Sequence, residues 1–182
     1  AGKAYLQVAH LAPFAEDASV TISVNGSPAL PNFEYGDSTA YIEFDPDDYD
    51  IAITPTGATT AVLEETVTLS ADTFYTAIAV GDNDNQPLDL LVMVDNIAAP
   101  SLGKFHLRLG HLAPFASDLE DTKADIRKDN GDLVLGGVKF GDVTGFIPLD
   151  AGTYDLKITT PGGGTTLINL APVNFTNGQI VS

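Results

Sequence analysis

Apolar and polar residues alternate over short runs along the whole chain, and the runs are rich in β-branched and aromatic side chains. This two-residue alternation is typical of half-buried β-strands. Glycine and proline separate the runs every few residues and indicate turns. The pattern predicts an all-β protein. The predicted strands are residues 4–9, 19–24, 40–44, 49–55, 62–69, 74–80 and 88–94, followed by 104–110, 123–128, 143–147, 154–159, 166–170 and 178–181.

The chain repeats itself. The pentapeptide His-Leu-Ala-Pro-Phe occurs at residues 10–14 and again at 111–115. The segment Tyr-Asp-Ile-Ala-Ile-Thr at 49–54 likewise matches Tyr-Asp-Leu-Lys-Ile-Thr at 154–159. A repeat of this length indicates two copies of one domain. We therefore expect two tandem β-sandwich domains, residues 1–98 and 99–182, with a short insertion in the second copy at 118–123.

One turn can be predicted in some detail. Asn25 and Gly26 lie between two expected strands, and this residue pair readily adopts positive φ angles. A tight hairpin is therefore expected there. The segment Asp-Asn-Gly-Asp at 129–132 takes the same place in the second copy.

The second copy has no counterpart of residues 77–80 or 88–94. We expect the second sandwich to lack its C-terminal strand or strands. A sandwich without a terminal strand exposes apolar surface and unpaired backbone groups, which another chain segment must cover. Either a second chain covers them, or residues beyond 182 complete the domain.

Composition and charge exclude several kinds of function and site. The formal net charge is −17, and residues 1–103 hold a single basic residue, Lys3. Nucleic-acid binding is not expected, because phosphates are bound by clustered Lys and Arg. Cysteine is absent, so disulfides and thiolate metal sites are excluded. No apolar run approaches the ~20 residues that a membrane span needs.

Several motifs together resemble a known family. The His-Leu-Ala-Pro turn at 10–13, the Val-Asn-Gly hairpin at 24–26 and the Asp-Ala-Gly-Thr-Tyr-Asp turn at 150–155 resemble the exported β-sandwich repeat known as domain of unknown function 4397. Phe14 and Phe115 stand where that family has Asp. The resemblance implies immunoglobulin-like sandwiches, often in tandem, on bacterial or archaeal exported proteins. It therefore implies an extracellular or cell-surface location, and it supplies no catalytic residue.

Candidate chemistry is sparse. Alternating oxygen side chains in one loop suit calcium, although the spacing departs from the EF-hand pattern; these residues are Asp82, Asn83, Asp84 and Asn85. Asn25 and Asn174 each begin an N-glycosylation sequon. The equivalent residues His10 and His111 are interpreted as structural, each imidazole binding the backbone of its turn. No catalytic triad, nucleophile elbow or phosphate loop is present, so an enzyme is not expected.

The leading hypothesis is a non-enzymatic structural protein that forms a homo-oligomer or polymer, such as an extracellular filament or surface layer, by β-strand addition. The expected donor is the N-terminal segment with Lys3, Tyr5, Gln7 and Ala9. The expected acceptor edge includes Gln179, Ile180 and Val181. The alternative is a monomeric adhesin or carbohydrate-binding module, with loops 81–87 and 118–123 as its binding face and calcium as its only candidate cofactor.

Overall fold

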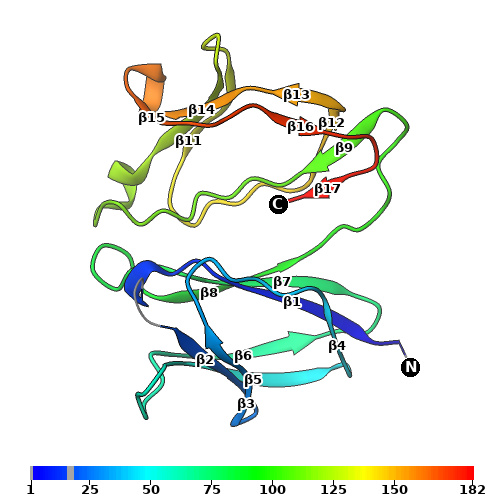
Figure 1. Ribbon diagram of the computed structural model, residues 1–182, viewed down its shortest axis with the longest axis vertical. Coiled ribbons are helices and arrows are strands. Elements are labelled where there is room, and N and C mark those ends of the chain that lie inside the picture. Colours follow the sequence, from blue (N-terminus) through cyan, green and yellow to red (C-terminus); the bar gives the residue numbers. More distant parts are fainter. Residues whose placement is uncertain (1, 16–18) are drawn as a thin grey trace. The chain divides into compact units, whose positions relative to one another are not determined.

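The computed structural model describes residues 2–15 and 19–182 (Figure 1). The chain forms two compact units, Ala1–Asn96 and Ile97–Ser182. Both are built from β-strands, and the only helical elements described are the short 3-10 turns η1 (Pro13–Ala15), η2 (Leu119–Thr122) and η3 (Pro161–Gly163). The predicted all-β class is confirmed.

The described residues of unit 1 form eight strands. They are β1 (Ala4–His10), β2 (Val20–Val24), β3 (Ser27–Phe33), β4 (Ile42–Phe44), β5 (Asp47–Pro55), β6 (Leu63–Leu69), β7 (Phe74–Val80) and β8 (Asp89–Val94). Seven of them match the strands predicted for the first repeat to within about two residues. The unpredicted strand is β3, which contains Pro28 and Pro31. Proline is tolerated there because β3 lies at the edge of its sheet.

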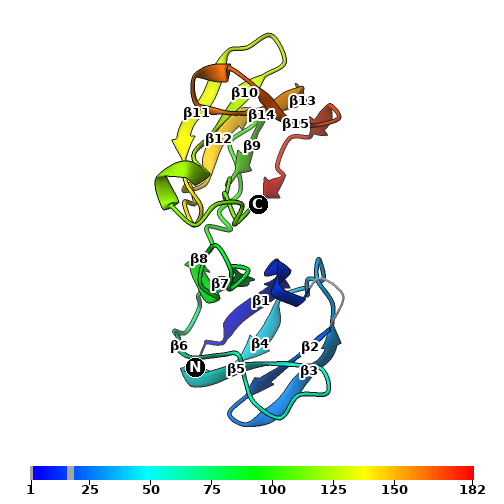
Figure 2. The same ribbon diagram turned by 90° about the vertical axis from the view of Figure 1, so that its left-hand side faces the viewer.

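Two four-stranded sheets form unit 1, with strand orders β4-β1-β7-β8 and β3-β2-β5-β6 (Figures 1 and 2). All neighbouring strands are antiparallel except β1 and β7, which run parallel from Tyr5↔Phe74 to His10↔Ala79. The expected hairpin joins β2 to β3, with positive φ at both Asn25 and Gly26.

One hydrophobic core lies between the two sheets of unit 1. Alternate residues of strands from both sheets fill it, as in a β-sandwich. The most buried of them include Leu6 of β1, Val20 of β2, Ile53 of β5 and Ala77 of β7, each no more than 3 % exposed. β7 contributes Tyr75, Ala77 and Ala79 to this core.

The strands of unit 2 follow the same order in their sheets as those of unit 1, but most of them are shorter. They are β9 (Lys104–Leu107), β10 (Ala124–Lys128), β11 (Leu133–Val138), β12 (Ile147–Asp150), β13 (Gly152–Tyr154), β14 (Leu156–Thr159), β15 (Thr166–Asn169), β16 (Val173–Phe175) and β17 (Ile180–Val181). The sheet orders are β12-β9-β17, β11-β10-β14-β15 and β13-β16. The strand predicted at 143–147 was wrong: only Val143 pairs, in an isolated bridge with Gly110, and the regular strand begins at Ile147.

Aromatic side chains hold one end of unit 2 together. Phe105 of β9 is fully buried and stacks on Phe175 of β16 with ring centroids 4.4 Å apart. Tyr154 of β13 meets both rings edge-on. These three rings form a small aromatic core at this end of unit 2.

Candidate functional site

The edge of β9 is only partly covered. β17, the short red arrow next to the C-terminus in Figure 1, runs parallel to β9 and pairs Ile180 with His106 and Val181 with Leu107. In this pairing, Arg108 N–H donates to Val181 C=O at 2.9 Å. In a parallel pair every second amide on one strand faces the same neighbour. The next amides on this side are those of Gly110 and Leu112, and neither has a hydrogen-bond partner among the described residues.

Unit 1 shows what covers the same edge when the sheet is complete. There β7 continues beside β1 for its full length, and Leu11 N–H donates to Ala79 C=O at 2.9 Å. β8 then pairs with β7 from Tyr75 to Val80. No described residue of unit 2 occupies the place of 76–80 or of β8. Among the residues described for unit 2, this part of the edge of β9 is therefore open.

An apolar groove lies beside this edge. We call it the open groove and define it by Gly110, His111 and Leu112 on the β9 side and Ala124, Ile126 and Val138 on the opposite sheet. Its volume is about 480 Å³, whereas the residual cavity in the core of unit 1 is about 40 Å³. The space that is filled in unit 1 is therefore empty in unit 2.

Large apolar side chains remain exposed along the open groove. Phe115 is 51 % exposed, and Leu167 and Ile168 on β15 are 46 % and 50 % exposed. Isolated apolar side chains on a surface are ordinary, but a contiguous lining of them beside unpaired amides is typical of an interaction site. The open groove is therefore the candidate functional site.

The predicted acceptor residues lie at one end of this site. Gln179 C=O accepts from His106 N–H at 2.9 Å, and Ile180 and Val181 form β17. These three residues thus fix the position at which any further strand beside β9 would begin. The sequence led us to expect an acceptor edge at these residues, but it did not identify the groove residues on β10 and β11, because only the sheet pairing shows which of their faces is exposed.

The segment predicted to be the donor is not a free strand but lies inside its own sheet. Tyr5, Gln7 and Ala9 belong to β1, which lies between β4 and β7 and is hydrogen-bonded on both sides. Lys3 is tied to Asp45 by a salt bridge of 2.7 Å. Donating this segment to another chain would break both pairings and expose Leu6. The structure therefore counts against β1 as a free donor strand.

The two repeated histidines close their turns. Nδ1 of His10 accepts from Ala12 N–H at 3.4 Å, and Nδ1 of His111 accepts from Ala113 N–H at 3.3 Å. His111 Nε2 in turn bonds to Thr122 C=O at 2.8 Å. Burial lowers the pKa of His10, although the nearby Asp37 carboxylate acts in the opposite direction. The neutral imidazole that results suits the structural role expected from the sequence.

The predicted calcium loop forms hydrogen bonds within itself. Asp82 Oδ1 accepts from the backbone N–H groups of Asp84, Asn85 and Gln86, and its Oδ2 accepts from the Asn85 side chain. Desolvation raises the pKa of Asp82, but these hydrogen bonds together hold it below its usual value. Asn83 lies between them with a positive φ of 62°. Within residues 2–15 and 19–182, no three His, Cys, Asp or Glu side chains are grouped to hold a metal ion.

Loop 118–123, the second proposed binding loop, is organised by Glu120 of η2. This carboxylate forms salt bridges with Lys123 and, at 2.7 Å, with Lys139. The two ammonium groups lower the pKa of Glu120 to about 2. The loop thus forms its own ion-pair network, and both lysines are engaged by Glu120.

Both sequon asparagines are exposed, as glycosylation would require. Asn25 lies in the hairpin turn, where its side chain accepts from Asp50 N–H at 2.9 Å. Asn174 lies in β16, and its side chain accepts from the Thr153 hydroxyl at 3.4 Å. The hairpin turn explains an asparagine at position 25 without any attached glycan.

None of the helical turns described has the length and apolar composition of a membrane-spanning helix.

Comparison with solved structures gives distant similarity. Nine chains match. One is the crystal structure of a leucine-rich repeat protein from Bacteroides thetaiotaomicron VPI-5482, with 14 % sequence identity and a TM-score of 0.24. The match covers 99 % of this chain and 25 % of that one, so the chain spans about a quarter of that protein's length. No curated protein sequence matches the chain.

The family comparison is more informative. The family described as Domain of unknown function (DUF4397) matches residues 4–122, which span unit 1 and the beginning of unit 2. The match includes both copies of the His-Leu-Ala-Pro-Phe turn and the groove residues 110–112. The chain belongs to the family described as Domain of unknown function (DUF4397).

Proposed function

We propose that this protein is a non-enzymatic extracellular structural protein whose copies assemble into a polymer by β-strand addition. Its two units are two tandem immunoglobulin-like sandwiches, and an extended segment of a second copy enters the open groove of unit 2. The observation that carries the proposal is the juxtaposition of the unpaired amides of Gly110 and Leu112 with the apolar groove of about 480 Å³.

Strand addition would satisfy both requirements of this site at once. An added strand supplies carbonyl oxygens to the free amides and side chains to the groove. Each large apolar side chain that is fully buried contributes about 1.5–3 kcal/mol. The same groove exists once in every copy, so occupation by a second copy gives a head-to-tail contact, which propagates into a filament when its rotation does not close a ring.

The test is the size and shape of the purified protein in solution. We expect filaments of this 182-residue chain in negative-stain electron microscopy. Ile126→Asp places a charge in the groove and should abolish the filaments. Leu133→Asp is the matched control, because Leu133 is 56 % exposed on β11 and lies outside the groove lining. Circular dichroism of both variants checks that the fold is intact.

Two results would contradict the proposal. Particles that remain monomeric at high concentration would show that copies do not fill the groove. A larger intact mass, with the excess explained by residues after Ser182, would show that the same chain completes unit 2. Monomers that bind immobilised polysaccharide only with calcium would favour the adhesin or carbohydrate-binding alternative.

A further inference from the structure

The backbone of His10, the last residue of β1, joins several segments of unit 1. Its N–H donates to Asp37 C=O at 3.0 Å, and its C=O accepts from Gly36 N–H at 2.8 Å. The next amide, that of Leu11, donates to Ala79 C=O on β7 at 2.9 Å. The end of β1 is therefore bonded to the loop before β4 on one side and to β7 on the other.

The turn that follows His10, residues 11–14, covers part of the hydrophobic core of unit 1. Ala12 is 1 % exposed and belongs to this core, and Phe14 packs against it. Both side chains would lose these contacts if the turn moved away from β1. Opening of the turn would therefore expose apolar surface.

The surroundings of the His10 side chain fit the neutral imidazole. The residue is fully buried, and Nδ1 accepts from Ala12 N–H at 3.4 Å. A neutral imidazole that accepts at Nδ1 carries its proton on Nε2. Within residues 2–15 and 19–182, Nε2 has no hydrogen-bond partner. Protonation would add an N–H at Nδ1 that faces the N–H of Ala12, and it would place a positive charge in a buried site with no bonded acceptor.

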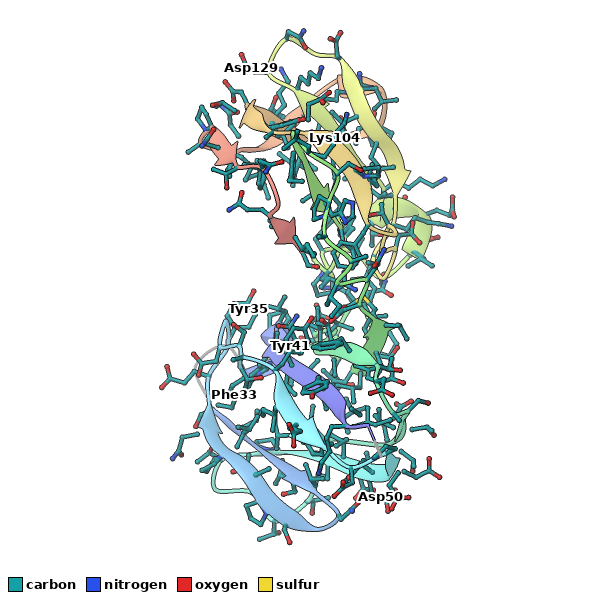
Figure 3. The ribbon with its side chains drawn as sticks, turned by 90° about the vertical axis from the view of Figure 1, so that its right-hand side faces the viewer. Phe33, Tyr35, Tyr41, Asp50, Lys104 and Asp129 are labelled. Carbon is teal, nitrogen blue, oxygen red and sulfur yellow. The ribbon has the colours of Figure 1, made fainter. Side chains whose placement is uncertain are left out.

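The groups that surround the imidazole do little to balance such a charge. The ring of Phe14 lies 5.9 Å from that of His10, and the ring of Tyr35, labelled in Figure 3, lies 6.1 Å from it. Among the described residues, Asp37 supplies the charge that favours protonation, but its carboxylate already accepts from Glu34 N–H at 2.8 Å. Burial outweighs the effect of Asp37 and lowers the pKa of His10.

The equivalent histidine of unit 2 has the same backbone bonds but a different environment. His111 N–H donates to Asp142 C=O at 2.9 Å, and Gly141 N–H donates to His111 C=O at 2.8 Å. Its Nε2 bonds to the C=O of Thr122 at 2.8 Å, and Thr122 belongs to η2 in the insertion of the second repeat. The imidazole of His111 is also partly exposed, so water can solvate a charge there.

We infer that His10 is a pH-sensitive switch: protonation of its imidazole in mildly acidic solution releases the turn 11–14 from β1 and exposes part of the core of unit 1. The corresponding turn of unit 2 stays closed under the same conditions. The inference is independent of the assembly proposed above, because every contact that it uses lies within one unit.

The direction of the effect follows from proton linkage. When the turn is open, His10 is solvated and its pKa is about 6.5. The open state therefore binds more protons than the closed state, in which the pKa is lowered. The closed turn has its full stability above about pH 6.5 and loses it as the pH falls toward the lowered pKa. The ratio of open to closed molecules should rise by up to about tenfold for each pH unit in this range.

Amide hydrogen exchange of the full chain compares the two units in one sample. NMR protection factors, which correct for the intrinsic pH dependence of exchange, are measured at His10 and Gly36 and at the equivalent amides of His111 and Gly141. Between about pH 6.5 and pH 5 we expect protection to fall at least about threefold at the first pair and to change by less than about twofold at the second. Equal changes at the two pairs, or no fall at the first, would overturn the inference.

Two variants show whether the imidazole itself is responsible. In His10→Asn the side-chain carbonyl can accept from Ala12 N–H but does not titrate in this range, so protection at Gly36 should become independent of pH. His111→Asn is the matched control and should leave the fall at Gly36 unchanged. A fall at Gly36 that persists in His10→Asn contradicts the inference. The comparison of the two units in the wild type decides the question even if this variant does not fold.

Discussion

Asp125 offers the clearest test of how unit 2 is held together. It is 4 % exposed on β10, and its carboxylate joins three parts of the fold. Oδ2 accepts from Arg127 Nη2 at 2.7 Å and from Gly162 N–H in η3 at 2.9 Å, and Oδ1 accepts from Gly137 N–H on β11 at 2.9 Å. Gly137 and Gly162 both have positive φ, so the carboxylate stabilises two backbone conformations that few other residues adopt.

Replacing this carboxylate removes all three bonds together. In Asp125→Ala the Arg127 guanidinium, whose side chain is only 17 % exposed, loses its carboxylate partner. Removing one partner of a buried ion pair costs about 3 kcal/mol or more. For a unit of this size, 3 kcal/mol corresponds to a decrease of roughly 15 °C in the melting temperature. Asp129→Ala is the matched control, because Asp129 lies exposed in the turn after β10 (Figure 3).

Urea unfolding and amide hydrogen exchange would measure the effect. We expect Asp125→Ala to lose protection at the amides of Gly137 and Gly162 and to unfold at lower urea than Asp129→Ala. If the two variants differ by less than about 0.5 kcal/mol, the range of ordinary surface substitutions, the reasoning is refuted.

The pH dependence supplies a second check on the same residue. The hydrogen bond from Arg127, followed by that from Gly137, lowers the pKa of Asp125 below its usual value. A carboxyl group whose pKa is lowered by folding contributes stability above its unfolded pKa of about 3.9, and this contribution is lost as the pH falls through the folded value. The difference between wild type and Asp125→Ala should therefore be constant near neutral pH and shrink below about pH 4.

Three further predictions concern other parts of the chain. Phe105→Ala removes a fully buried ring from the aromatic cluster of unit 2 and should lower the free energy of unfolding by about 3–5 kcal/mol, measured by urea titration. Gly81→Ala should destabilise unit 1 by at least about 1 kcal/mol in a thermal melt, because φ is +89° and the added Cβ would lie 2.0 Å from Pro87 C=O; Gly57→Ala, with a similar φ and open space, is the control. Calcium should leave the melting temperature unchanged, since the Asp82 carboxylate already binds three backbone amides; an increase that Asp82→Ala abolishes would restore the calcium site.

Local patterns were enough to predict most of the strands. Alternation of apolar and polar residues located all of unit 1 except β3, and the Asn25-Gly26 pair located its hairpin. The short strand β16 was not predicted. β3 and β11 were missed because prolines interrupt the first and the pair Gly136-Gly137 interrupts the second. Both are edge strands, where such residues are tolerated, but edge position is a property of the sheet and cannot be read from periodicity.

The sequence by itself determined the all-β class, the repeat and the family, because each depends on residues that are close in the chain or on direct comparison of two segments. The tertiary structure decided the rest. The parallel pairing of β1 with β7 joins residues far apart in the chain, and it alone shows that Tyr5, Gln7 and Ala9 are enclosed within their own sheet. The open groove likewise exists only where β9, β10 and β11 meet, since its amides and apolar side chains become neighbours through sheet pairing.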